Sequence, residues 1–279
     1  MMKETRAEHL AVEKLRPFDG HPFKVVDNEE MDQLTWSILT QGLLTPLVVR
    51  PLDNGEYEVI SGHRRLHACK KAGIETVPAL IYAIDRDAAA IALVDSNLQR
   101  EHILPSEKAF AYKLKLEAMN HQGRTSGQVG QKWTRDEIAE GESGRQVQRY
   151  IRLTNLIPGV LQKVDEGRIA LTPAVELSYL TDAEQEDLLE TMESEDCTPS
   201  LSQAIQMKAL SQSGQLDMDT IFHIMTQPKA NQQEKISFKV SELRDFFPRH
   251  YTAAQMMQEI KMALKERQQR LARQRDHSR

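Results

Sequence analysis

The stretch Ser61-Gly62-His63-Arg64-Arg65 decides how the amino-terminal part of this chain is interpreted. It follows a strand-like run at residues 57–60 and opens a helix-like run that reaches Ala72, with Gly73 as the stop. A glycine at a strand end lets an anion approach the backbone, and a helix N-terminus offers unpaired N–H groups and a partial positive charge. The two arginines add forked donors that match phosphate oxygens. The stretch predicts a phosphate site, but a purely structural role is the alternative.

A second segment makes the pattern more specific. Asn97-Leu98-Gln99-Arg100-Glu101 precedes Leu104-Pro105-Ser106-Glu107-Lys108-Ala109. In order, the three segments resemble the Gly-Glu-Arg-Arg box, the Glu-Asn-x-Gln-Arg box and the Leu-x-Pro-x-Glu-x-Ala run of the ParB/Noc family of bacterial DNA-partition proteins. The resemblance covers roughly residues 10–180.

The resemblance implies the fold class and the division of the chain. We expect an α+β ParB/sulfiredoxin-like domain, then an all-α domain with a helix-turn-helix, then a small, mostly helical carboxyl-terminal domain. The predicted boundaries are 1–104 for nucleotide binding, 105–212 for DNA binding with the helix-turn-helix at about 134–153, and 213–279 for the carboxyl-terminal region with a basic tail.

Local patterns predict the elements of the first domain. Residues 1–20 are expected to form a loose lead-in, and a capping-box-like helix start is expected at Asp27. Asp53-Asn54-Gly55 predicts a hairpin turn, because Asn-Gly tolerates the positive φ angles of such turns. Pro78 indicates that the strand expected at 76–84 is an edge strand or contains a bulge.

Composition excludes several classes of protein. The chain has 279 residues, a net charge of −5 and a pI of about 6.0, which argues against a wholly basic nucleic-acid coat. We find no apolar run of about 18 residues, so no membrane span is expected. Cys69 and Cys197 are the only cysteines, so a disulfide framework is not expected, and a cytoplasmic, nucleoid-associated location fits. Neither the cysteines nor the histidines have metal-site spacing.

The resemblance also implies a CTP site with Mg²⁺. It assigns the triphosphate to Gly62, Arg64 and Arg65, and the rest of the site to residues around Asn97 and to the loop 41–46, which would line the base pocket. Glu101 is expected to act as an indirect Mg²⁺ ligand and as the catalytic group of any weak CTPase. The full predicted set is Thr45, Gly62, His63, Arg64, Arg65, Ser96, Asn97, Arg100 and Glu101.

This chain departs from the family pattern at the same site. The box glutamate is His63, and the acidic residue before Asn97 is Ser96, with Asp95 one position earlier. The early Gln-Pro-Arg of the family is His21-Pro22-Phe23. Cation–phosphate contacts supply binding, whereas hydrolysis also needs an oriented water, so these departures predict slow or absent hydrolysis. A solvent-facing position is the alternative for His63, and a local ion pair for Glu101.

The DNA-reading segment follows a glycine-rich stretch. Thr134–Ala139 resembles the first helix of a helix-turn-helix, and Ser143 can cap a recognition helix over 144–153. We expect Arg145, Gln146 and Gln148 near bases, and Arg149 and Arg152 near phosphates. An amphipathic bundle helix is the alternative.

The site of a common family contact is altered further on. Where the family often has Gly-His-Ala-Arg, this chain has Thr172-Pro173-Ala174-Val175. The histidine and arginine contacts are therefore missing, and binding to the common centromere sequence of the family, a parS-like site, is in doubt.

The leading hypothesis is a CTP-responsive, sequence-specific DNA-binding homodimer that closes as a clamp on DNA. It would act in plasmid, mobile-element or chromosome partition, with a ParA-like ATPase as partner. The second hypothesis is a transcription regulator or nucleoid-binding factor on the same scaffold. The third is a ParB-like phosphotransferase, although Cys69 fits the core better than a nucleophile. The apolar stripe at Met256, Ile260, Ala263 and Leu264 with the basic tail indicates either a helix packed on its own domain or a dimerisation element.

Overall fold

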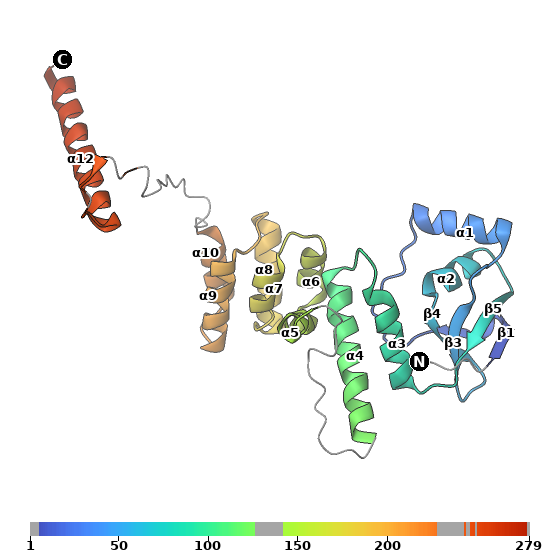
Figure 1. Ribbon diagram of the computed structural model, residues 1–279. Coiled ribbons are helices and arrows are strands. Elements are labelled where there is room, and N and C mark those ends of the chain that lie inside the picture. Colours follow the sequence, from blue (N-terminus) through green and yellow to red (C-terminus); the bar gives the residue numbers. More distant parts are fainter. Residues whose placement is uncertain (1–5, 126–141, 228–242, 244–245, 249, 278–279) are drawn as a thin grey trace. The chain divides into compact units, whose positions relative to one another are not determined.

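The computed structural model describes residues 6–125, 142–227, 243, 246–248 and 250–277 (Figure 1). The chain divides into a larger unit, Met1–Gln227, and a smaller unit, Pro228–Arg279. The predicted helix Thr134–Ala139 lies outside the described residues. Among the described residues no helix has both the length and the apolarity that a membrane crossing requires.

A five-stranded mixed sheet forms the centre of the amino-terminal part, with the strand order β1-β5-β3-β4-β2. β1 is antiparallel to β5 and β3 to β4, whereas β3 is parallel to β5 and β2 to β4. The hairpin predicted at Asp53-Asn54-Gly55 connects β3 and β4, and Gly55 has a φ of 79°. The strands are β1 Arg6–Ala11, β2 Leu15–Pro17, β3 Leu47–Pro51, β4 Tyr57–Ser61 and β5 Thr76–Ile81.

Two expectations about this sheet were wrong. Residues 6–11 are not a loose lead-in, because they form β1 and pair along the full length of β5. β5 is an internal strand despite Pro78. The register of β5 with β3 begins at Ala79, one residue after the proline, so Pro78 lies beyond the end of that ladder.

Helices cover both faces of the sheet. α1 (Glu29–Gln41) and α2 (His63–Lys71) pack in one apolar cluster with Val59 of β4. α3 (Arg86–Leu98) packs in another with Ile60, because successive side chains of a strand point to opposite faces. Asp85 caps α3, and α1 is capped by Asn28 and not by Asp27, where a capping-box-like start was expected.

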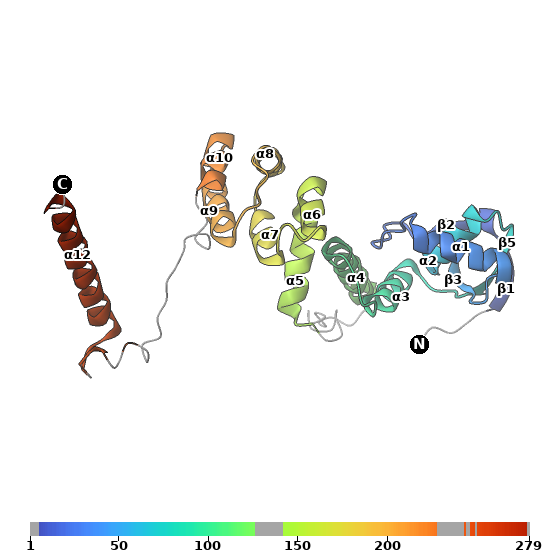
Figure 2. The same ribbon diagram turned by 90° about the horizontal axis from the view of Figure 1, so that it is seen from above.

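The helical remainder of the larger unit begins with α4 (Pro105–Thr125), which lies beside α3 (Figure 2). Pro105 opens this helix, a position that suits proline because the first N–H groups of a helix have no partner within it. The later helices share one core that includes Leu153, Leu177 and Met207. They are α5 Gly144–Arg152, α6 Pro158–Asp165, α7 Leu171–Leu177, α8 Asp182–Ser194, α9 Leu201–Gln212 and α10 Met218–Thr226, with short 3-10 turns at Val12–Lys14 and Leu153–Asn155.

In the smaller unit the principal described element is α12 (Ala253–His277), which contains the apolar stripe noted in the sequence. Met256 is buried within this unit, whereas Leu264 of the same apolar stripe is 58% exposed. The amphipathic pattern therefore corresponds to a helix that is only partly covered by its own unit.

Candidate functional site

A cavity of about 240 Å³ lies at the N-terminus of α2. It brings together seven of the residues singled out in the sequence, from α2, from α3 and from the turn after α3. These are Gly62, His63, Arg64, Arg65, Ser96, Asn97 and Arg100. The cavity is completed by residues of the loop after β2 and the end of β4: His21, Phe23, Lys24, Val25 and Ser61.

The backbone conformation at the start of α2 requires a glycine at position 62. It is the N-cap of α2, in the left-handed region with a φ of 103°. A Cβ at this position would lie 2.6 Å from Cδ2 of Leu47. The backbone can take this sharp turn from strand to helix only without a side chain, which leaves the first N–H groups of α2 open toward the cavity.

Arg65 is held in place by backbone carbonyls. Its Nη1 donates to the carbonyl oxygens of Thr45 at 2.7 Å and Pro46 at 2.8 Å. Thr45 is not among the lining residues, so its contribution here is to position Arg65. Arg65 and Gly62 are also neighbours, because the guanidinium lies 3.1 Å from the position of a Gly62 Cβ.

The cavity concentrates positive charge without a matching carboxylate. The Arg100 guanidinium lies over the Phe23 ring, 5.5 Å from its centroid, and Arg64 forms a 3.0 Å ion pair with Glu30 outside the cavity. Among the described residues that line the cavity, none is Asp or Glu. Burial lowers the pKa of Arg65 and of Arg100, which reflects cations that have lost water. A bound anion would compensate this unmatched positive charge.

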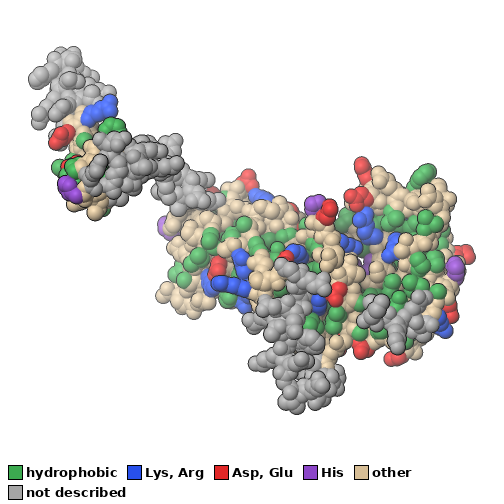
Figure 3. All heavy atoms as spheres, in the orientation of Figure 1, with side chains coloured by type: hydrophobic (Ala, Val, Ile, Leu, Met, Phe, Trp, Pro, Cys, Tyr) green, Lys and Arg blue, Asp and Glu red, His purple; other side chains and the backbone are tan. Residues whose placement is uncertain are grey.

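Basic side chains also gather on the surface near the junction of the α+β part with the helices (Figure 3). The side chains of Arg64 and Lys24 are 42% and 57% exposed, Arg100 is also exposed, and Arg65 is partly buried. Several cavity cations therefore face solvent, which favours entry of a polyanion from solution.

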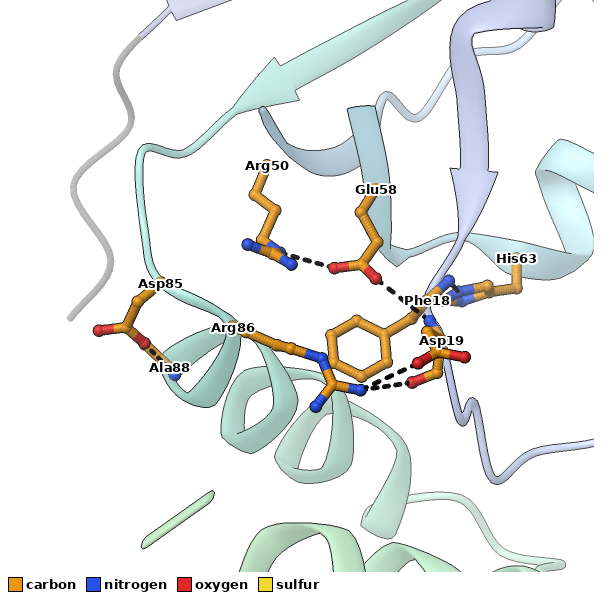
Figure 4. A network of polar contacts seen from close by, with 8 residues as sticks. All are labelled: Phe18, Asp19, Arg50, Glu58, His63, Asp85, Arg86 and Ala88. Carbon is orange, nitrogen blue, oxygen red and sulfur yellow. Dashed lines mark hydrogen bonds and ion pairs between the residues drawn. The ribbon is translucent and has the colours of Figure 1, made fainter. Parts of the chain in front are cut away.

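His63 is not solvent-facing. Its Nε2 accepts a 3.3 Å hydrogen bond from the backbone N–H of Phe18, within the polar network that also joins Asp19 to Glu58 (Figure 4). The His21 ring lies against the His63 ring, with 3.7 Å between centroids. Burial, followed by nearby positive charge, lowers the pKa of His63 to about 3, and burial lowers the pKa of His21 to about 4.

Asn97 and Ser96 close the far side of the cavity. Asn97 is 7% exposed, and its Nδ2 donates to the Leu93 carbonyl at 2.8 Å and to Ser96 Oγ at 3.3 Å. The amide oxygen is the remaining polar atom of this side chain. The carboxylate of Asp95 pairs with Lys115 on α4. It therefore does not replace the family carboxylate next to Asn97.

Glu101 lies apart from this group. It directly follows Arg100 but is exposed and is not among the lining residues. The structure thus brings together the predicted phosphate ligands and leaves the predicted catalytic carboxylate outside the cavity.

Sequence reasoning missed the residues that join this loop to the helical part. The backbone N–H of Lys24 donates to Glu107 of α4 at 2.8 Å, and Lys24 Nζ pairs with Asp165 of α6 at 3.1 Å. Asp165 also accepts from the Ser106 N–H at 2.9 Å and from its hydroxyl at 2.6 Å. Glu107 lies in the recognised Leu-Pro-Ser-Glu run, so that motif was the available signal; nothing marked Asp165.

The second candidate region is a groove of about 480 Å³ between α5 and α7. Ser143 caps α5 as expected, accepting from the Gln146 N–H. The groove contains three of the five predicted DNA-contacting residues, namely Arg145, Gln146 and Arg149. Arg145 is exposed at the amino-terminal end of the helix, which is the end that recognition helices direct at bases.

Arg149 is fixed by neighbours on both helices. Its Nη1 donates to Gln146 Oε1 at 3.1 Å, and its Nη2 donates to Thr172 Oγ1 of α7 at 2.6 Å. Thr172 occupies a position where the family often has a DNA-contacting residue, and here its hydroxyl holds Arg149 in the groove. No local pattern indicated this contact, because it joins residues 23 positions apart.

Arg152 and Gln148 do not line the groove. Arg152 donates to the Ser178 hydroxyl at 3.1 Å and lies 3.7 Å from the Tyr179 ring centroid. Its guanidinium is therefore engaged with the carboxyl-terminal end of α7.

Comparisons with known proteins agree with the amino-terminal architecture. Residues 1–98 match the family model described as the ParB N-terminal domain. The chain is 30% identical to the probable chromosome-partitioning protein ParB of Vibrio cholerae over 247 residues, which are 88% of this chain and 80% of that protein. It is 39% identical to the nucleoid occlusion protein of Geobacillus kaustophilus over 118 residues, and the matched part is 41% of this chain and 42% of that protein.

Two solved structures of the C-terminally truncated ParB from Caulobacter crescentus also match. The one complexed to the centromeric parS site is 24% identical, covers 74% of this chain and 99% of that chain, and has a TM-score of 0.42. The one complexed with CTP-gamma-S is 26% identical, covers 67% and 99%, and has a TM-score of 0.32. On the strength of the extended match to the Vibrio protein, the chain belongs to the ParB family of chromosome-partitioning and nucleoid occlusion proteins.

Proposed function

We propose that this chain is a nucleotide-gated DNA clamp that binds CTP in the α2 cavity and a specific DNA duplex through α5. One observation carries the proposal: Gly62, Arg65 and Arg100 meet in a cavity whose described lining has positive charge and no carboxylate. Such a site suits a polyphosphate, because backbone N–H groups, a helix dipole and arginines all favour the same ligand.

In this proposal Arg65 and Arg100 bind the inner part of the triphosphate and Arg64 its exposed end, exchanging its ion pair with Glu30. Loop 41–46 contributes to the base pocket. Mg²⁺ fits only as a partner of the phosphates, because hard cations need oxygen ligands and the described lining residues offer no carboxylate. When bound, Mg²⁺ would neutralise phosphate charge, and Glu101 remains a proposed indirect ligand.

The proposed hydrolysis is slow or absent. Ser96 offers a hydroxyl that already donates to the Leu93 carbonyl at 2.9 Å, His63 is neutral and its Nε2 is occupied, and Glu101 is exposed. None of these groups is arranged to orient a water as a general base. A long-lived bound nucleotide, and hence a long-lived clamp, is the consequence we expect.

On the DNA side, Arg145 and Gln146 are the proposed base-reading residues and Arg149 the proposed phosphate ligand. Gln148 is proposed beside them, on the basis of the sequence register alone. For Arg152 we now favour a structural role, because its guanidinium is engaged by Ser178 and Tyr179. The first helix of the motif is proposed for residues 134–139, which lie outside the described residues, within the proposed DNA-binding part, 105–212.

Nucleotide and DNA can influence one another only if each binds two states with different affinity. Lys24, Glu107, Ser106 and Asp165 connect the cavity loop with the start of α4 and the end of α6. We propose that polyphosphate binding alters this connection, and that α4 then reorients so that two copies enclose DNA. Dimerisation by region 213–279 and a ParA-like ATPase partner are part of the same proposal, as is a location on the nucleoid.

A nucleoid-binding factor that does not act in partition is the second candidate. The match to a nucleoid occlusion protein, 39% identical over 118 residues, favours it. A phosphotransferase acting through Cys69 is disfavoured, because this side chain is fully buried and burial raises the pKa of its thiol.

The first experiment measures retention of radiolabelled CTP on filters by the full chain, with and without DNA recovered by genome-wide crosslinking. We expect retention that Arg65→Ala abolishes and Arg16→Ala leaves unchanged, since Arg16 forms an exposed ion pair with Glu56 away from the cavity. No retention under any condition contradicts the nucleotide part of the proposal.

The crosslinking profile then separates the two candidates. A narrow peak with broad shoulders is expected for a clamp that loads and spreads. Narrow peaks without shoulders, in cells where CTP is retained by the purified chain, would support a regulator on the same scaffold.

A further inference from the structure

The histidine pair at the cavity is the feature that the proposed function leaves unexplained. His21 and His63 both line the cavity, their rings are 3.7 Å apart, and His21 also meets Phe23 edge-on at 5.7 Å. Two imidazoles in contact beside several arginines are an unusual environment, because each protonated ring would add to an uncompensated positive charge.

The two rings are not equivalent. His63 Nε2 accepts from the Phe18 N–H, and the ring has a further hydrogen bond with the backbone of Val59. A proton on Nε2 would place two donors against each other, so His63 is fixed as a neutral ring. Within the pair, His21 is therefore the ring that can gain a proton.

We propose that His21 is a proton-linked ligand of the polyphosphate: it is neutral in the free protein and becomes protonated when the anion binds. This inference rests on the proposed function of the cavity. The positive charge that His21 adds to the site would then be present only while the anion is bound.

The charged side chains that line the cavity together with His21 are all positive. Positive groups come from α2, from the turn after α3 and from the loop itself: Arg64, Arg65, Arg100 and Lys24. The nearby carboxylates have other partners. Glu107 accepts from the Lys24 N–H, Asp19 pairs with Arg86, and Glu58 pairs with Arg50.

The physical consequence follows from this balance of charge. In the free protein, burial lowers the pKa of His21 to about 4; a hydrogen bond with the Phe23 backbone opposes this shift in part and the charge of Arg100 adds to it, so the ring is neutral at pH 6–8. A polyphosphate in the cavity cancels the field of the arginines and adds a close negative partner, which raises the pKa of His21. Because the bound form then holds more protons than the free form, affinity rises as pH falls, by up to about tenfold per pH unit for one proton.

The test is isothermal titration calorimetry of the full chain with CTP and Mg²⁺ at pH 7. Two phosphate-free buffers with different ionisation enthalpies are used, so that the difference in heat reports the number of protons taken up. We expect proton uptake by the wild type and a clearly smaller uptake by His21→Gln, together with a shallower rise of affinity between pH 8 and pH 6.

One further variant serves as a control. His67→Gln alters an exposed histidine of α2 that pairs with Asp27 away from the cavity, and it should keep the wild-type uptake. The terminal phosphate of CTP titrates near neutral pH in every case, so only the difference between proteins is attributed to His21.

A direct readout on the wild type does not depend on how the variants fold. NMR of the histidine ring protons should show one ring, assigned to His21 by comparison with His21→Gln, that titrates well below pH 6.5 in the free protein and at higher pH with CTP. Equal proton uptake in the wild type and His21→Gln, or a ring pKa unchanged by CTP, overturns the inference. No CTP binding by the wild type at any pH instead contradicts the proposed function.

Discussion

The α2 cavity and the α5–α7 groove both gather arginines, but they hold them in different ways. Arg65 in the cavity is held by two backbone carbonyls and is partly buried, and the described lining contains no carboxylate. In the groove, Arg149 is held by side chains of Gln146 and Thr172, Arg145 is exposed, and the lining includes Glu176.

This difference indicates two kinds of anion site. Backbone-held cations without carboxylates give a preformed site of fixed size, which suits a small multivalent ligand. Exposed cations beside an acidic residue give an adjustable surface, which suits a long polyanion read by contacts at its edge. Glu176 is itself paired with Lys208 at 2.8 Å, so it reduces the charge of the groove only in part.

A substitution of Gly62 should have the largest effect and should separate the cavity from the groove. Gly62→Ala forces a side chain into a φ of 103° and against Leu47, so we expect loss of CTP binding and a decrease of about 1–3 kcal/mol in the free energy of unfolding. DNA binding without nucleotide should change little. Binding assays and chemical denaturation measure the two effects.

Gly55→Ala is the matched control. Gly55 also has a positive φ, 79°, but nothing lies within 4 Å of an added Cβ. It should lower stability by about 1 kcal/mol and leave CTP affinity unchanged. If both variants lose CTP binding equally, the effect is one of stability and not of the cavity.

Arg65→Ala tests the fixed cation directly. We expect CTP affinity to fall by about 10-fold to 100-fold, since a buried charge-assisted contact is worth roughly 1.5–3 kcal/mol. Arg65→Lys should not restore it, because an ammonium cannot satisfy both the carbonyls of Thr45 and Pro46 and a phosphate. Full rescue by lysine would contradict the preformed geometry.

Arg145→Ala tests the adjustable surface. A loss of about 1–3 kcal/mol in DNA binding and a change in base preference are expected, with CTP binding alone unaffected. The control is Arg168→Ala, which removes an exposed cation paired with Asp196 in the same helical part. Fluorescence anisotropy over a range of salt concentrations distinguishes a base contact from a phosphate contact, because only the latter flattens the salt dependence.

The smallest expected effect on DNA binding is that of Arg152→Ala. Its guanidinium stacks on Tyr179 and donates to Ser178, so we expect a loss of about 1–2 kcal/mol of stability. The salt dependence of DNA binding should stay that of the wild type. A weaker salt dependence of DNA binding, with unchanged stability, would instead support the phosphate contact that the sequence predicted for Arg152.

Local signals in the sequence were sufficient for much of the fold. The turn at Asp53-Asn54-Gly55 and the cap at Ser143 each act within a few residues, so a linear pattern contains them. The burial of Cys69 also followed from its place on the apolar side of α2.

Contacts between distant segments were beyond such patterns. β1 is stabilised by pairing with β5, some seventy residues later, and its own residues have little strand character. Pro78 was misjudged because the length of the β3 ladder, not the proline, decides which hydrogen bonds are needed. For the site, motifs identified the cavity cations, whereas the exposure of Glu101 and the contacts of Thr172 and Asp165 depend on tertiary packing.

The carboxylate of Asp165 has a consequence for chimeric proteins. It binds both the first turn of α4, through Ser106, and Lys24 of the cavity loop, so three segments from different parts of the chain share one side chain. A hybrid that joins the first hundred residues of one relative to the helices of another would keep each half intact and still lose this shared contact. A hybrid in which Lys24, Ser106 and Asp165 are exchanged as a set would keep the contact that couples the two halves.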